Sequence, residues 1–80
     1  MSDAREWGEC GYSRMVSRAA WYDGVDVPSI LISWGQKMAE SRGWKCLPGW
    51  TAEPSFHEPY NRESLWIDVY GPVEREVTRQ

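Results

Sequence analysis

The chain has 80 residues, with 9 Lys and Arg against 12 Asp and Glu and a formal net charge of −3. A chain of this length forms one domain and buries only about 60% of its unfolded surface. It therefore has room for a small core but not for a large multi-step enzyme.

The N-terminal segment bears on the cellular location of the protein, but its secondary structure is ambiguous. Its first residues lack the apolar stretch of a secretory signal, which favours a cytoplasmic protein. Residues 13–22 are ambiguous, because Met15, Ala19 and Tyr22 have helical spacing whereas Trp21 to Gly24 resemble a strand entering a tight turn. We favour a strand over 13–22.

Residues 28–42 predict an amphipathic helix. Pro28 suits its first turn, Asp26 is placed to cap it, and Gly43 suits the position just past its end. Gly35 opposes the helix by about 1 kcal/mol relative to Ala. The apolar stripe consists of Val27, Ile30, Leu31, Trp34 and Met38, and the face predicted to meet water consists of Gln36, Lys37, Glu40 and Ser41.

Two strands are predicted after this helix. Residues 44–47 form a short one, and residues 64–70 form the best one, with Leu65, Ile67 and Val69 alternating with polar and aromatic residues before Gly71 and Pro72 end it. We expect these strands to pair, and we expect the charged tail 74–80 to fray. The predicted fold is a single α+β domain over 1–80, with one amphipathic helix packed on a small antiparallel sheet.

Residues 48–63 are the candidate functional segment. Three prolines exclude a regular helix or a central strand here, and long connections without secondary structure are usually functional. Aromatic rings in such a loop indicate a partner-binding surface. The predicted binding residues are Trp50, Glu53, Phe56, His57, Glu58, Tyr60 and Arg62, with Trp21 and Tyr22 as a second patch.

Six Trp and four Tyr accompany few aliphatic residues. Each ring can bury about 150–250 Å², so the aromatics are expected to replace aliphatic side chains in the core. Trp34, Trp66 and Trp44 are assigned to it. Trp50 and Trp21 lie beside turn signals and are the candidate interface anchors.

Catalytic and metal-binding patterns are missing from the sequence. The single histidine, His57, has no nucleophile motif beside it, and Cys10, Cys46 and His57 lack the close pairing of zinc ligands. We expect neither an enzyme nor a metal or other cofactor. The cytoplasmic assignment favours reduced cysteines, with a Cys10–Cys46 disulfide as the alternative.

The resulting functional expectation is a non-catalytic protein that binds a protein partner with a basic surface through an aromatic, acidic surface. In size, acidity and aromatic content the chain is similar to small phage-encoded accessory proteins, including inhibitors of host polymerases, nucleases or CRISPR complexes. The resemblance implies a stoichiometric blocker of a nucleic-acid-handling complex.

Two alternatives stay open. The chain could be a structural accessory subunit of a particle or tail, in which case self-association is expected. It could also bind single-stranded nucleic acid through Trp stacking with Arg14, Arg18 and Arg42, although the net negative charge and the lack of a basic stripe oppose direct nucleic-acid binding. The longest apolar run, Ile30 to Ile32, is too short to span a membrane.

Overall fold

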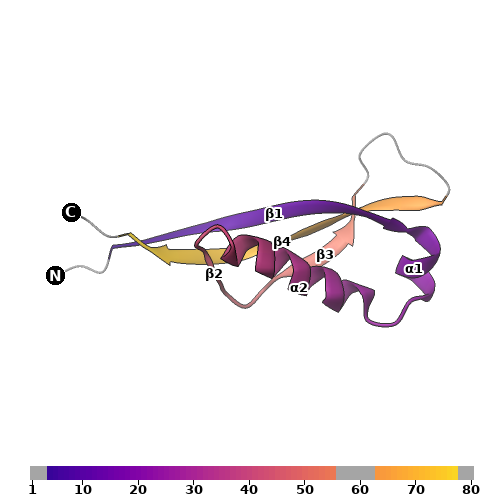
Figure 1. Ribbon diagram of the computed structural model, residues 1–80, viewed down its shortest axis with the longest axis horizontal. Coiled ribbons are helices and arrows are strands. Elements are labelled where there is room, and N and C mark those ends of the chain that lie inside the picture. Colours follow the sequence, from indigo (N-terminus) through magenta and orange to yellow (C-terminus); the bar gives the residue numbers. More distant parts are fainter. Residues whose placement is uncertain (1–3, 56–62, 78–80) are drawn as a thin grey trace.

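Two long strands from opposite ends of the sequence organise the fold. A computed structural model describes residues 4–55 and 63–77. Strand β1 (Arg5–Ser17) pairs antiparallel with β4 (Ser64–Glu76) along its whole length and without a bulge. β4 is central, with the short strands β2 (Lys45–Cys46) and β3 (Thr51–Pro54) on its other edge (Figure 1).

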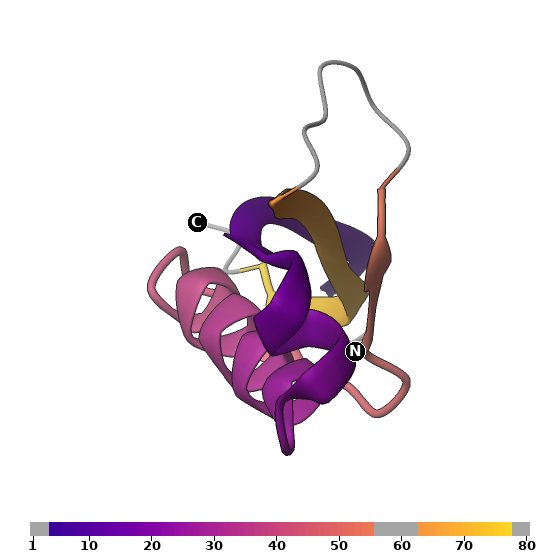
Figure 2. The same ribbon diagram turned by 90° about the vertical axis from the view of Figure 1, so that its right-hand side faces the viewer.

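Two helices complete the described part of the chain. Helix α1 (Arg18–Asp23) follows β1 directly, and α2 (Val27–Glu40) runs along one face of the sheet (Figures 1 and 2). The predicted α+β class, with an amphipathic helix on an antiparallel sheet, is confirmed. Neither helix of the described residues is long and apolar enough to cross a membrane.

The core lies between α2 and β4 and is aliphatic. Leu31 of the helix and Leu65, Ile67 and Val69 of β4 form one buried cluster, and Ala39 and Val73 are also buried. Each large side chain stabilises the fold by about 1.5–3 kcal/mol. The prediction that Trp34, Trp66 and Trp44 belong to the core is confirmed only in part. Trp34 packs half-buried against the core, as do Trp21 and Trp50, whereas Trp66 lies on the face of β4 that points away from α2. No tryptophan of the described residues is fully buried. The half-buried tryptophans are Trp21, Trp34, Trp44, Trp50 and Trp66.

The helix predicted over 28–42 is α2, which spans Val27–Glu40 and differs from the prediction in its capping and packing. Asp26 takes the N-cap position with φ 62° and makes no side-chain capping hydrogen bond, so its contribution is a left-handed turn. Gly43, with φ +89°, turns the chain after the helix. Gly35 is buried because it faces β4 closely, whereas Ile30 is exposed and lies outside the stripe.

The segment predicted as a strand over 13–22 is a strand only to Ser17. The Ser17 hydroxyl accepts a hydrogen bond from the Ala20 backbone N–H at 3.2 Å, and this N-cap begins α1. Trp21 and Tyr22 are therefore helical. The competing helical spacing of these residues was the better guide beyond Ser17.

Strand β4 does not end at Gly71 and Pro72, and residues 74–76 of the predicted frayed tail belong to it. Pro72 is tolerated in a central strand because its nitrogen faces the point where β2 ends, and its carbonyl still accepts the Leu47 N–H at 3.0 Å. Strand pairing by Thr51–Pro54 likewise shows that part of the predicted loop 48–63 is regular, as an edge strand.

Candidate functional site

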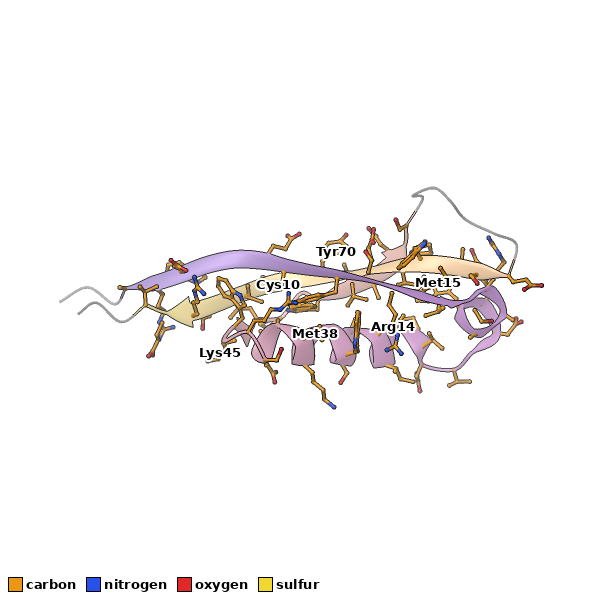
Figure 3. All side chains as sticks on the ribbon, turned by 45° about the horizontal axis from the view of Figure 1, so that its top comes forward. Cys10, Arg14, Met15, Met38, Lys45 and Tyr70 are labelled. Carbon is orange, nitrogen blue, oxygen red and sulfur yellow. The ribbon has the colours of Figure 1, made fainter. Side chains whose placement is uncertain are left out.

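One face of the sheet is covered by α2, and no helix of the described residues covers the other. Because strand side chains alternate and the register is continuous, odd residues of β1 share this second face with even residues of β4. Tyr70 projects away from α2, whereas Arg14 projects towards it (Figure 3). The residues that we call the open face are Trp7, Glu9, Ser13, Met15, Glu53, Trp66, Asp68 and Tyr70.

The open face displays apolar side chains at both ends of β1. Trp7 is 66% exposed and Met15 is 48% exposed. Met15 lies directly opposite Trp66, and the half-buried Tyr70 lies opposite Gly11 between the two ends. Large rings at exposed sheet positions are available for contact with a partner and are typical of interface anchors.

Three carboxylates gather around Tyr70. Glu53 on β3 lies directly opposite Asp68 on β4, and like charges at opposed positions destabilise a sheet. The Tyr70 hydroxyl donates to Glu53 Oε1 at 2.9 Å, and the Ser13 hydroxyl donates to Asp68 Oδ1 at 2.7 Å. The hydrogen bond to Glu53 raises the pKa of Tyr70, with further contributions from slight burial and from the charges of Glu53, Glu9 and Asp68.

The acidic region ends towards the chain termini. Glu74 is only 9% exposed, and its carboxylate lies 3.6 Å from the Arg5 guanidinium and 3.9 Å from the Lys45 ammonium. The positive charges of Arg5 and Lys45 therefore neutralise the negative charge of Glu74. Apart from Glu76, which lies opposite Arg5 at the end of the strand pairing, the remaining negative charge on this face lies at Glu9, Glu53 and Asp68.

The helix side of β1 has the opposite character. The Arg14 guanidinium lies 5.3 Å from the centre of the Trp34 ring, Trp34 meets Tyr12 edge to face at 6.1 Å, and Arg42 lies 5.2 Å from the Tyr12 ring. Such contacts contribute about 0.5–1 kcal/mol each at exposed sites. This cation–aromatic ladder fastens β1 to α2.

The predicted site residues do not form one surface. Trp50 is half-buried, with its indole against Gly35 and Gly71 and its Nε1 donating to the Pro72 carbonyl at 3.0 Å. Glu53 lies on the open face. Trp21 packs against the core whereas Tyr22 is 64% exposed, so α1 does not present them together. Phe56, His57, Glu58, Tyr60 and Arg62 lie outside the described residues.

Sequence reasoning missed the β1 part of the open face. Gly8 and Gly11 weaken the strand signal of residues 5–12, so the sequence alone does not place Trp7 and Glu9 beside Asp68. The alternation of Trp66, Asp68 and Tyr70 with buried aliphatic residues was visible in the sequence. It could have identified the β4 half of this face.

The two cysteine thiols lie apart from this face. Cys10 and Cys46 are free and lie on strands at opposite edges of β4, on the α2 side. Burial raises the pKa of the Cys46 thiol, with smaller contributions from Glu40 and Cys10. Within residues 4–55 and 63–77, no group of three or more metal-ligating side chains comes together.

No protein-family model, curated protein or solved structure matches this chain. Functional inference therefore starts from the geometry of the open face.

Proposed function

We propose that the protein is a non-catalytic binding protein whose open face engages a protein partner with a basic surface. The observation that supports this most directly is the opposed pair Glu53 and Asp68. Folding gains nothing from two like charges at this position. Natural proteins accept such local costs mainly at functional sites, and a cationic partner would turn the repulsion into attraction.

The aromatic residues supply the apolar part of the same contact. Trp7 and Met15 are exposed on β1, and Trp66 lies beside Met15. Interfaces typically combine buried aromatic anchors with charged groups that select the partner. A face with carboxylates between such anchors suits a groove lined by Arg and Lys.

A basic groove of this kind is typical of nucleic-acid-handling proteins, where it holds phosphates. We therefore extend the proposal to a stoichiometric inhibitor of such a complex, of the kind that small phage accessory proteins provide. The size, the net charge of −3 and the aromatic content of the chain support this extension.

The first test titrates an arginine-rich peptide into the intact protein and measures binding by calorimetry. Neutralising the open face with Glu9→Gln, Glu53→Gln and Asp68→Asn should weaken binding about tenfold, since each exposed pair contributes up to about 1 kcal/mol. The matched control, Asp23→Asn with Asp26→Asn and Glu40→Gln, removes the same charge from exposed positions elsewhere. Equal losses in both variants would show a response to net charge alone and would refute the proposal.

The second test identifies the partner. The intact protein and the triple open-face variant are used to capture proteins from a lysate of a candidate host, with mass spectrometry as the readout. A basic nucleic-acid enzyme that is captured by the intact protein, inhibited by it, and lost with the variant supports the inhibitor proposal. An enzyme whose activity is unchanged by saturating protein contradicts it.

Single-stranded nucleic-acid binding is the second candidate, because the ladder brings Arg14 and Arg42 beside the Trp34 and Tyr12 rings. Rings beside arginines are typical of surfaces on which bases stack. This candidate predicts oligonucleotide binding that falls steeply with salt and is lost in Arg14→Gln with Arg42→Gln. Retention of binding in that variant would exclude the ladder as the site.

A further inference from the structure

Along β1, the backbone N–H and C=O groups of alternate residues point towards β4 or towards the outer edge of the sheet. Just beyond the strand ends, the Arg18 N–H donates to the Glu63 carbonyl at 2.8 Å and the Val77 N–H donates to the Ala4 carbonyl at 2.9 Å. Because the register between these points has no bulge, even residues of β1 direct their backbone groups towards β4. Odd residues, with Gly11 at the centre, direct theirs outward.

These outward groups have no backbone partner within the described residues, because β1 ends the strand order and pairs with β4 alone. An exposed edge readily accepts another strand, and proteins usually protect it with Pro, Lys, a bulge or a covering segment. β1 contains neither Pro nor Lys over its 13 residues, and its pairing is regular. The edge is therefore suited to strand addition.

We propose that β1 pairs antiparallel with β1 of a second copy of this chain, about a two-fold axis at Gly11. This register overlaps all 13 residues of the strand. Gly11 meets its own counterpart, so no side chains collide on the axis. The outward N–H and C=O groups of the odd residues then find partners across the interface.

The side chains favour this occupant and this register. Trp7 and Met15, the two exposed large apolar residues of β1, lie at equal distances from Gly11 along the strand, so each meets the other across the interface. Methionine sulfur contacts with aromatic rings are favourable. Glu9 meets Ser13, and no like charges are opposed. A shift of the axis to Cys10 or Tyr12 places Trp7 opposite a serine instead.

The dimer contains one continuous sheet, with both α2 helices on the same face and the two open faces joined. The inference does not depend on the proposed partner of the open face, since strand pairing uses the edge of β1. Loss of peptide binding and loss of dimerisation can therefore be observed separately.

Sedimentation equilibrium of the intact chain under reducing conditions, over a wide concentration range, tests the proposal. We expect a monomer–dimer equilibrium that approaches twice the chain mass of 9.3 kDa. Gly11→Pro removes an outward N–H that β4 does not use, and a Cβ at Gly11 meets only Tyr70 Cβ at 3.6 Å. It should weaken dimerisation at least about tenfold, since each dimer loses two backbone hydrogen bonds.

Gly11→Lys provides a second variant, because it keeps the N–H but opposes two cations on the axis. Gly11→Ser is the matched control and should dimerise like the original chain. Circular dichroism checks that each variant is folded. A monomer at every concentration overturns the proposal and leaves the edge for an extended segment of another protein. A dimer that persists in both Gly11→Pro and Gly11→Lys also overturns it.

Discussion

The indole of Trp50 lies against the Cα of Gly71, and a Cβ at residue 71 would overlap the ring. Trp50 Nε1 donates to the carbonyl of the next residue, Pro72, at 3.0 Å. The irregular connection between β2 and β3 is thereby held against the central strand. A ring that sequence reasoning assigned to a partner also has a structural role in this fold.

Gly71→Ala should destabilise the protein by about 3 kcal/mol, because the methyl group displaces the indole and removes its hydrogen bond. The free energy of unfolding in urea measures this. Gly8→Ala is the control, since its Cβ would meet only Trp44 at 3.9 Å, and it should change stability by less than about 0.5 kcal/mol. Equal effects of the two substitutions would contradict the packing of Trp50 on Gly71.

Gly35→Ala should also destabilise the protein, although helix propensity alone predicts a gain of about 1 kcal/mol. A Cβ at residue 35 would lie 2.7 Å from Val69 Cγ1 and 3.2 Å from Trp50 Cζ3, and overpacking of this kind costs about 1–3 kcal/mol. Thermal unfolding measures the sign. A higher melting temperature for Gly35→Ala would show that α2 does not approach β4 this closely.

Glu53→Gln should stabilise the fold by about 0.5 kcal/mol while weakening binding of a basic partner. The amide oxygen still accepts the Tyr70 hydroxyl, but the repulsion from Asp68 is removed. Urea unfolding at low ionic strength measures the gain, and added salt should diminish it by screening the original pair. Lower stability than the original chain at low salt would contradict the assigned repulsion.

Tyr70→Phe should reduce stability at neutral pH but not at strongly alkaline pH. The hydrogen bond to Glu53 raises the pKa of Tyr70 above its ordinary value of 10.0, so the folded state holds this proton more tightly than the unfolded state. The associated stability is complete below about pH 10 and is lost as the pH rises through the folded-state pKa. Urea unfolding across this range, with Tyr22→Phe as control, measures the effect. A difference that stays constant at all pH values would argue against it.

Cys46 should react slowly with iodoacetamide in the folded protein, because burial raises the pKa of its thiol and lowers the thiolate fraction. The Cys10→Ser variant isolates this thiol. At about pH 8 its alkylation rate should be lower than that of the same variant unfolded in urea, as followed by mass spectrometry. Equal rates would place Cys46 in an exposed environment.

The spacing of apolar residues predicted the elements that bury one regular face of apolar side chains. The apolar spacing from Val27 to Met38 identified α2, and Leu65, Ile67 and Val69 identified the first half of β4. Each of these patterns reflects one buried face. The α+β class followed from them.

The candidate site was less accessible to sequence reasoning. The sequence predicted an aromatic, acidic binding surface that includes Glu53, and this surface stays a proposal. The partners of Glu53, however, are Asp68 in register and Tyr70 through its hydroxyl, and neither is near it in the sequence. Their proximity depends on how β3 lies beside β4.

By itself, the sequence determined α2, the first half of β4, and the acidic and aromatic character of the protein, because these depend on composition and on spacing within one segment. Only the tertiary structure decided that the glycine-containing segment 5–12 is a strand, that β4 continues through Pro72, and that Trp7, Glu9 and Asp68 share a face. A β-strand obtains its hydrogen bonds and register from a partner, and the partner of β1 lies at the opposite end of the chain.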